Sequence, residues 1–226
     1  YAASEHGPGI DNLMIISLVM IFAVQFVTQA LLHYFAFKYR GEEGRKALYF
    51  ADSNRLEAIW TIIPIIALSI LILYGLYTWN NVMFVDEADE EDAIYIELYA
   101  KQFSWEARYA GKDNMLGKSN VRFIEGVNTV GVDPADPNGH DDIITRELHL
   151  PKGKRVIFKI RSQDVLHSAY MPHFRAQMNC VPGMVTQFSF IPTMTTQEMR
   201  ETPEMINKVA HINKIRGKKS AKLVQN

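Results

Sequence analysis

The hydrophobic positions are concentrated in the N-terminal third of the chain, and the remainder is polar. Residues 13–37 and 58–79 contain no charged side chain, and each run is long enough to cross a bilayer as a helix. Pro64 lies near the start of the second run, where neighbouring groups can satisfy the freed backbone. The pattern therefore predicts a transmembrane α-helical hairpin that follows an external N-terminal segment of residues 1–12.

The charges that flank the two spans predict their orientation. The connection of residues 38–57 contains several lysines and arginines, whereas residues 1–12 contain none and residues 80–92 form an acidic linker. The positive-inside rule places the connection in the cytoplasm, or an equivalent compartment, and both flanking segments outside. The acidic run is typical of a solvated linker, and a docking site for a basic partner is the less favoured alternative.

Polar side chains interrupt the first span more often than a helix surrounded only by lipid would allow. They are Ser17, Gln25, Thr28, Gln29 and His33. Polar groups at this depth usually face another helix or a cavity. Two alternatives are equally supported: these residues pair the two helices of this chain, or they pack against a partner subunit.

Residues 93–192 change to short alternating runs with turn residues between them, which is typical of an all-β sandwich. Five aromatic residues are predicted to share one face of the first run: Tyr95, Tyr99, Phe103, Trp105 and Tyr109. Further strands are predicted at residues 121–125, 143–150, 155–161 and 184–191. The turn-rich residues 133–142 are expected to form a surface loop, because their carboxylates do not follow the spacing of a calcium loop.

The C-terminal segment of residues 193–226 returns to a helical pattern. Thr202, Pro203 and Glu204 have the form of a helix start. One face beyond them is apolar, and lysine and arginine side chains occupy the other face and the tail. The favoured interpretation is an amphipathic basic helix that packs on its own domain. The alternative is contact with anionic lipid or an acidic partner.

The net charge disfavours nucleic-acid binding, and the cysteine count excludes disulfides and cysteine-only metal sites within the given sequence. The 226 residues have a formal net charge of −1, so no global basic field favours nucleic acid. Cys180 is the only cysteine, so neither a disulfide nor a metal site made only of cysteines can form within this sequence. The chain starts at Tyr1 rather than Met, and we expect an N-terminus that was processed or that lies outside the given sequence.

The stretch from Asp164 to Gly183 is the strongest candidate for chemistry, because it joins two predicted strands and contains His167, Met171 and two prolines. On the residues alone, a histidine in such a connection is more often a hydrogen-bonded structural residue than a ligand. His167 and the neighbouring His173 do not form a recognisable metal-binding spacing. The residues by themselves leave the role of His167 open.

Three runs of sequence resemble subunit II of cytochrome c oxidase, in the dinuclear copper branch of the haem–copper oxidase family. They are Leu56-Glu-Ala-Ile-Trp-Thr-Ile-Ile-Pro64, then Gln102-Phe-Ser-Trp105 with Tyr109, and finally Asp164-Val-Leu-His-Ser followed by Pro172 and Pro182-Gly183. The three runs occur in the order that the family has. The resemblance implies that the predicted hairpin is followed by an outward-facing, cupredoxin-like Greek-key β-sandwich, of which residues 93–192 are an incomplete part.

By this resemblance, His167 is an imidazole ligand of a dinuclear copper centre. In the family, that centre receives electrons from cytochrome c and passes them to haem in the catalytic subunit, where oxygen is reduced to water and protons are pumped. The remaining ligands follow in a Cys-x3-Cys-x3-His-x2-Met segment, which these residues lack and which is expected beyond Asn226. Cys180 stands where the family has no ligand and is interpreted as a small buried thiol. Haems are expected only in the partner subunit.

The resemblance also implies roles for three further residues. Glu57 would lie at the entry of a proton channel, and it would also complete a helix-capping pattern with Asn54. Phe103 occupies the position of the family's tryptophan through which electrons enter, and Trp105 follows on the same aromatic run. Because Phe replaces Trp, the expected donor is either cytochrome c or a dedicated, tethered cytochrome, which would also suit a respiratory supercomplex.

The expected partners are the haem-bearing catalytic subunit I, other oxidase subunits, membrane lipid and the cytochrome donor, without nucleic acid. The expected location is a bacterial cytoplasmic membrane, in preference to the mitochondrial inner membrane, with the β domain on the outer (periplasmic) side. One alternative is a copper-free quinol oxidase subunit, which the retained His167 disfavours. The other is a non-enzymatic, membrane-anchored β domain, which does not account for the three motif runs.

Overall fold

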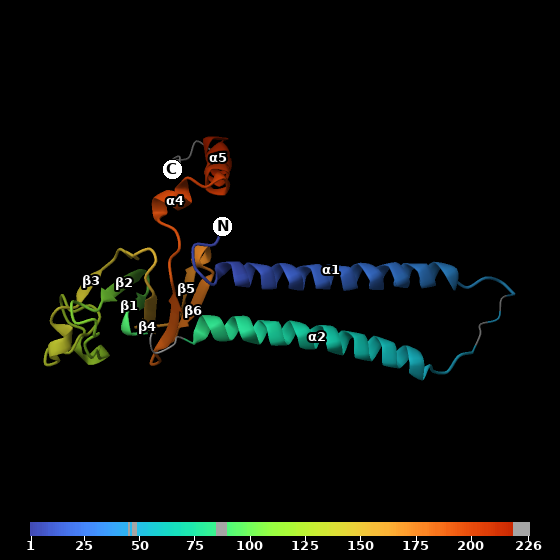
Figure 1. Cartoon of the computed structure of the whole chain (residues 1–226), viewed down its shortest axis with the longest axis horizontal. Helices are drawn as coiled ribbons and strands as arrows, with labels where there is room; N and C mark the ends of the chain where they lie inside the picture. The colour runs from blue at the N-terminus through green and yellow to red at the C-terminus, as the bar shows by residue number, and fades with distance from the viewer. Residues whose placement is uncertain (45, 47–48, 85–89, 219–226) are drawn as a thin grey trace. The chain divides into compact units, whose positions relative to one another are not determined.

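The computed structural model describes residues 1–44, 46, 49–84 and 90–218. Contacts divide the chain into two compact units. One is Gly9–Asn80, and the other joins Tyr1–Pro8 to the residues from Asn81 onward. The first unit consists of two long helices, and the second contains the β-strands (Figure 1). The prediction of a helical hairpin followed by a β domain is confirmed.

Helices α1 (Gly7–Lys38) and α2 (Asn54–Met83) are both long and apolar enough to cross a membrane. Their apolar side chains are exposed along most of their length, as expected of lipid-facing helices. Helix α2 is capped by Ser53, whose hydroxyl accepts a hydrogen bond from the Leu56 backbone N–H at 3.4 Å. The predicted capping role of Asn54 is therefore wrong, because the helix begins one residue earlier than the motif suggested.

The polar residues of the first span bond largely to their own helix. The Ser17 hydroxyl donates to the Leu13 carbonyl oxygen at 2.7 Å, and the Thr28 hydroxyl donates to that of Val24 at 2.9 Å. The His33 ring nitrogen Nδ1 lies 2.7 Å from the carbonyl oxygen of the residue one turn earlier. Since these groups are satisfied locally, they do not by themselves require a partner helix.

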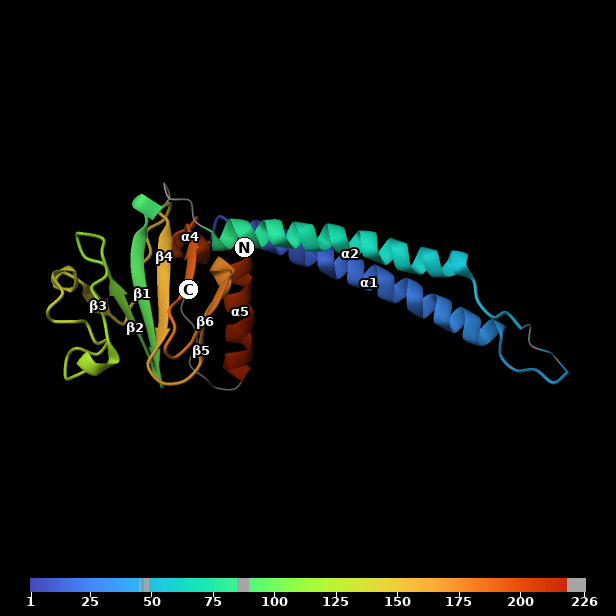
Figure 2. The same ribbon diagram turned by 90° about the horizontal axis from the view of Figure 1, so that it is seen from below.

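A five-stranded sheet forms the main layer of the β domain, with the strand order β3-β2-β1-β4-β7 (Figures 1 and 2). Neighbouring strands are antiparallel except β1 and β4, which are parallel. The bounds are β1 Ile94–Lys101, β2 Ser104–Tyr109, β3 Ile143–Thr145, β4 Val156–Ser162 and β7 Thr186–Phe190. A second layer is the antiparallel pair β5 (His167–Met171) and β6 (Ala176–Cys180), joined through the 3-10 turn Pro172–Phe174.

The aromatic run predicted as one strand is in fact the hairpin β1–β2, with Gln102 and Phe103 between the two strands. The register pairs Ala100 with Trp105 and Ile96 with Tyr109. Paired residues of a sheet share a face, so Trp105 and Tyr109 lie on the face opposite to that of Tyr95 and Tyr99. The prediction that all five aromatic residues share one face is wrong. Because the turn has two residues, each even-numbered residue of β1 pairs with an odd-numbered residue of β2. Odd-numbered residues therefore lie on opposite faces in the two strands.

Two predicted strands are shorter than expected or absent. Residues 121–125 begin with the 3-10 turn Val121–Phe123, where the Asn120 side chain accepts a hydrogen bond from the Arg122 backbone N–H. Of residues 143–150, only the first three pair with β2, because the Thr145 hydroxyl accepts a bond from the Glu147 backbone N–H and the ladder ends there. In both places a side chain competes with strand pairing for backbone groups. Conversely, the predicted connection between residues 164 and 183 contains the hairpin β5–β6.

The two faces of the five-stranded sheet differ in chemistry. On one face, Ile96, Phe158 and Phe190 are fully buried, and Phe158 and Phe190 stack with ring centroids 5.5 Å apart. On the other face, the buried Arg108 side chain donates to Glu97 at 2.6 Å and to Asp142 at 2.8 Å. It also donates to the Gly117 carbonyl oxygen at 2.8 Å. The long connection between β2 and β3 thus covers this second face by bonding to a buried cation.

The N-terminal residues before α1 belong to the β domain. The Ala3 backbone N–H donates to the His173 carbonyl oxygen at 2.6 Å, and the Thr193 N–H donates to the Ala3 carbonyl oxygen at 2.8 Å. The Glu5 carboxylate accepts from the Ile191 N–H at 2.6 Å. This N-terminal arm, residues 1–6, places the start of α1 on the same side of a membrane as the β domain, in agreement with the predicted orientation.

After β7 the chain forms two helices, α4 (Thr196–Arg200) and α5 (Pro203–Lys218). Thr195 begins α4 with a capping box, in which its side chain and that of Glu198 each bond to the backbone of the other. The acidic residues 86–89, Arg45 in the basic connection, and residues 219–226 of the tail lie outside the described residues.

Candidate functional site

His167 lies at the first position of β5, at the end of the domain where the β1–β2 turn is also found. Its Nε2 atom is 2.7 Å from Oδ1 of Asp164, and its side chain is 18% exposed. The other carboxylate oxygen of Asp164 accepts from the Gln102 backbone N–H at 2.7 Å. One carboxylate therefore ties the histidine to the turn that contains Phe103.

Two aromatic residues lie beside this group. The Trp105 ring meets the His167 ring edge-to-face, with centroids 5.9 Å apart. Phe103, in the turn between β1 and β2, is fully exposed, with a relative exposure of 101%. The structure thus brings Phe103, Trp105 and His167 to one end of the domain. Phe103 is the most exposed of the three side chains, and the Trp105 and His167 rings are less exposed.

The Asp164 carboxylate is held in its charged form. The hydrogen bond to His167, with further bonds from the backbone N–H groups of Gln102 and Val165, lowers the pKa of Asp164 to about 2. An ionised carboxylate at this position favours the His167 tautomer that has its proton on Nε2. The lone pair is then on Nδ1, which is the nitrogen that a metal ion would bind.

Cys180 is the cross-strand partner of His167 in the β5–β6 register. Its side chain is completely buried, and burial raises the pKa of the thiol. Burial thus favours the neutral form, whereas metal ions bind the thiolate. The register places Cys180 beside His167 on the same face of the hairpin, where it packs in the interior.

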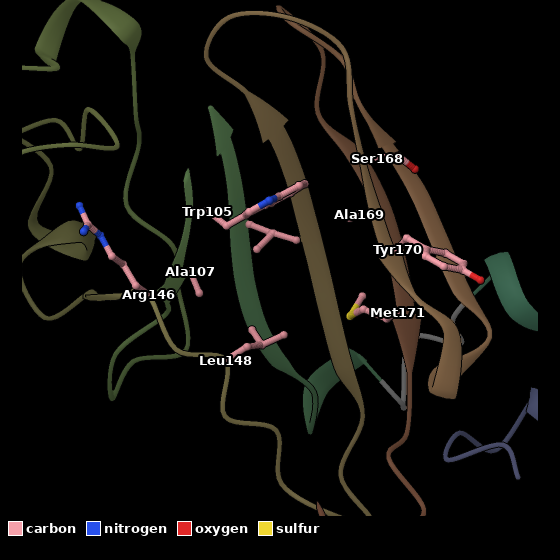
Figure 3. Close-up of a pocket in the computed structure, with 9 residues that line it drawn as sticks. Trp105, Ala107, Arg146, Leu148, Ser168, Ala169, Tyr170 and Met171 are labelled. Carbon is pink, nitrogen blue, oxygen red and sulfur yellow. The ribbon is translucent and has the colours of Figure 1, made fainter. Parts of the chain in front are cut away.

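A pocket on the apolar face of the sheet opens beside Trp105, between the β1–β2 hairpin and β5. Leu98, Ala107 and Leu148 contribute to its wall on the sheet side. Figure 3 shows Trp105 and Met171 pointing towards this space and Tyr170 pointing away from it. The edge of the apolar face next to His167 is therefore less completely covered than the centre around Phe158.

Glu57 lies elsewhere, in the first turn of α2, where its side chain is exposed. It belongs to the helical unit, whereas His167 and both aromatic residues belong to the β unit. The sequence-predicted residues therefore divide between two places, with Phe103, Trp105 and His167 together and Glu57 apart.

Two family models match the chain. Residues 2–79 match the transmembrane domain of cytochrome c oxidase subunit II, and residues 96–206 match the periplasmic domain of the same subunit. The chain belongs to the cytochrome c oxidase subunit II family. The predicted family and the predicted fold, a helical hairpin with a cupredoxin-like β domain, are both confirmed.

Two bacterial relatives show the extent of the match. This subunit II chain is 38% identical over 164 residues to the alternative cytochrome c oxidase subunit 2 of Bradyrhizobium diazoefficiens, covering 72% of this chain and 58% of that protein. It is 28% identical over 207 residues to the cytochrome c oxidase subunit 2 of Thermostichus vulcanus, covering 81% of this chain and 63% of that protein. The chain thus spans about three fifths of the length of these relatives.

One solved structure with a detectable match is the periplasmic domain of subunit II from Bradyrhizobium japonicum. It is 22% identical to this subunit II chain, with coverage of 45% of this chain and 65% of that domain. Its TM-score of 0.29 is too low to support a fold. The family assignment depends on the sequence matches.

The described residues fit part of a copper centre. Within residues 1–44, 46, 49–84 and 90–218, no group of three or more His, Cys, Asp or Glu side chains is arranged to hold a metal ion. His167 nevertheless has the feature that a ligating imidazole requires, a carboxylate bonded to its second ring nitrogen. Sequence reasoning missed this role of Asp164. The signal was present, since Asp164 precedes His167 by three residues in the same motif.

Proposed function

We propose that this chain is the electron-accepting part of subunit II in a terminal respiratory oxidase, and that it takes electrons from cytochrome c at a dinuclear copper centre. The observation that carries this proposal is the group of Asp164, His167 and Trp105 at one end of the β domain, within a chain of the subunit II family. Electrons then pass to haem in the catalytic subunit, where oxygen is reduced to water and protons are pumped.

His167 supplies one imidazole to this centre, and the given sequence does not contain the pair of cysteines that the family uses for the thiolates. When bound, a copper pair supplies one-electron redox chemistry. Asp164 fixes the orientation of the His167 ring through the 2.7 Å contact to Nε2, and the packed Trp105 ring restricts its rotation. Cys180 packs beside His167 and is not a ligand.

Phe103 and Trp105 form the path by which electrons enter. Phe103 presents its whole ring to solvent in a turn that Asp164 holds through the Gln102 backbone N–H. The Trp105 ring contacts the His167 ring directly, and Phe103 precedes Trp105 by two residues in the chain. The donor is a cytochrome c, either soluble or tethered within a respiratory supercomplex.

Glu57 is the entry of a proton channel that leads to the catalytic subunit. A carboxylate in the first turn at the end of a span can exchange protons with water while it faces a polar path. The β domain and the N-terminal arm lie on the outer side of the membrane, which places Glu57 on the inner side. The bacterial relatives favour the cytoplasmic membrane of a bacterium.

The decisive experiment compares His167→Gln with Cys180→Ala in the assembled, membrane-embedded oxidase. His167→Gln is expected to remove copper absorption outside the haem subunit and to slow cytochrome c oxidation by at least about 100-fold, because second-shell changes alone cost 10–100-fold. Cys180→Ala, at the paired position on the neighbouring strand, is expected to keep the copper spectrum. Loss of copper in both variants, or in neither, would contradict the proposed ligand assignment.

The channel role of Glu57 is tested separately by Glu57→Ala. This change is expected to slow proton-coupled turnover while the copper spectrum stays intact, because Glu57 lies in the helical unit and not in the β unit. Unchanged turnover would remove the channel role. A wild-type complex that contains no copper outside the haem subunit would instead favour a quinol-oxidising subunit.

A further inference from the structure

Ser162 breaks the pattern of the apolar face at the last position of β4. The residues of β4 that face the same way before it are Val156, Phe158 and Ile160, and all three are fully buried. Ser162 follows at the next position of the alternation and is also buried, with a relative exposure of 8%. A buried hydroxyl where the pattern favours an apolar side chain is unfavourable unless it is hydrogen-bonded. The bonds of this hydroxyl therefore indicate what the serine does.

The Ser162 hydroxyl bonds to the turn that follows β4. It donates to the Val165 carbonyl oxygen at 2.5 Å and accepts from the Asp164 backbone N–H at 3.4 Å. A serine hydroxyl has one proton to donate and lone pairs with which to accept, so both bonds can form at once. The serine thus holds the backbone of Asp164 and of the residue after it.

This turn, residues 163–166, has little packing to hold it. All four residues are exposed, whereas Ser162 before them is buried. A segment without buried side chains keeps one conformation only where hydrogen bonds fix it. The Gln163 backbone N–H donates to the Ala100 carbonyl oxygen at 2.9 Å, which fixes the start of the turn. The bonds from Ser162 reach further, to the middle of the turn where Asp164 lies.

Asp164 needs a defined position because its carboxylate contacts two different elements. One oxygen is 2.7 Å from Nε2 of His167 at the start of β5. The other accepts from the Gln102 backbone N–H, in the turn between β1 and β2, at 2.7 Å. Hydrogen bonds weaken steeply as their angles depart from the preferred range, so a rotation of the Asp164 backbone would weaken these contacts. The two bonds from Ser162 to the turn oppose that rotation.

We propose that Ser162 is a positioning residue for the copper ligand His167, and that it acts through Asp164. The inference rests on the proposed copper role of His167. The Ser162 hydroxyl fixes the turn, the turn aims the Asp164 carboxylate, and the carboxylate orients the imidazole ring. The same carboxylate bonds to the turn that contains Phe103, so Ser162 also helps to hold the ligand and the entry turn together.

The first test is hydrogen exchange at two backbone amides in the assembled oxidase. Ser162→Ala removes one oxygen atom and both of its hydrogen bonds. Exchange at Gln102, whose N–H is held by Asp164, should become faster on the order of tenfold. Exchange at Gln163, whose N–H is held by the Ala100 carbonyl oxygen, should not change. Equal acceleration at both amides would mean that the end of β4 has opened, and this purely structural role would overturn the proposal.

The matched control is Ser189→Ala in β7. Ser189 is also buried, at 3% exposure, and it pairs with Ile157 near the other end of β4. Its hydroxyl has no hydrogen-bond partner among the residues that the structure describes, so the same chemical change removes no bond. Exchange at Gln102 should therefore match that of the wild type. An effect of Ser162→Ala no larger than that of this control would contradict the proposal.

The second test measures how well copper is retained against a chelator. Asp164→Ala should weaken retention about 10–100-fold, and Ser162→Ala should weaken it by about tenfold. The double variant Ser162→Ala/Asp164→Ala should retain copper as well as Asp164→Ala alone, because a residue that acts through Asp164 then has nothing left to position. Losses that multiply in the double variant would overturn this route of action.

The two tests separate this inference from the proposed function. A wild-type oxidase that contains no copper outside the haem subunit would overturn the proposed function. Exchange at Gln102 does not depend on copper, so it would still decide whether Ser162 holds Asp164 in place.

Discussion

The two faces of the five-stranded sheet stabilise the β domain in opposite ways. One face buries aliphatic and aromatic side chains such as Ile96 and Phe158, whose packing is tolerant of small changes in shape. The other face buries Arg108 between two carboxylates, where each group depends on its partners. The apolar face thus buries hydrophobic side chains against the second layer, whereas the ionic face attaches the connection between β2 and β3 at a specific place.

The pKa of Asp142 shows that burying the charged groups of the ionic face is unfavourable. Burial raises the pKa of this carboxyl even though Arg108 lies 2.8 Å away and lowers it. Glu97 is shared between Arg108 and Arg161, so one carboxylate serves two cations. A buried pair of this kind is expected to contribute little net stability when intact, but its disruption exposes the full desolvation penalty.

The largest effect is expected from Arg108→Met. It leaves Glu97 and Asp142 buried beside an apolar side chain, which should cost about 3–5 kcal/mol in the free energy of opening the sheet. Amide hydrogen exchange of β1 and β4 in the assembled complex measures this energy. Arg122→Met, at an exposed site in the same connection, serves as the control and should change it by less than about 0.5 kcal/mol.

An intermediate effect is expected from Lys101→Met at the edge of the ionic face. The Lys101 ammonium lies 3.1 Å from Glu106, a buried carboxylate that also accepts from Thr129. Burial acts to raise the pKa of Glu106, but these hydrogen bonds and the charge of Lys101 outweigh it and lower the pKa overall. Removing one partner of a buried acceptor should cost about 1–3 kcal/mol.

The pH dependence of the same variant sharpens the prediction. Because the folded-state pKa of Glu106 is lowered, its stabilising contribution is present above its unfolded pKa and is lost as the pH falls through the folded value. In Lys101→Met the folded pKa rises, so acid should destabilise the sheet from a higher pH than in the wild type. Hydrogen exchange across the acidic range measures the shift, and parallel profiles for the two proteins would contradict this account.

The smallest effect is expected on the apolar face. Phe158→Leu keeps a large hydrophobic side chain next to Phe190 and should cost less than about 1.5 kcal/mol. The same exchange measurement applies, with copper absorption as a check that the His167 end is unaffected. A loss as large as that of Arg108→Met would mean that the two faces do not differ in their tolerance.

How well the sequence predicted each part depended on the range of the interactions involved. The two spans were recoverable because a long uncharged run has one stable solution in a bilayer. The face of the sheet on which Trp105 lies could not be predicted in this way. It depends on the two-residue turn that contains Phe103, because this turn places the odd-numbered residues of β2 on the face opposite to those of β1. The ionic face was also missed, since Arg108 and Asp142 are distant in sequence and only the covering connection brings them together.

The candidate site was predicted through its motif. A histidine between two strands is uninformative by itself, and the resemblance supplied the copper role of His167. The carboxylate at Asp164 could have been inferred from the principle that ligating histidines bond through their second nitrogen to an acceptor. Its second contact, to the Gln102 backbone N–H, depends on tertiary structure and could not have been predicted from local pattern.

The N-terminal arm has a consequence for biogenesis. Glu5 and Ile191 are hydrogen-bonded although they are 186 positions apart, and helix α1 follows the arm immediately. The edge of the sheet beside β7 therefore cannot be finished until the segment ahead of the first span has been exported. Completion of the β domain therefore depends on which side of the membrane receives residues 1–6, and a chain inserted with the opposite topology would lack these contacts.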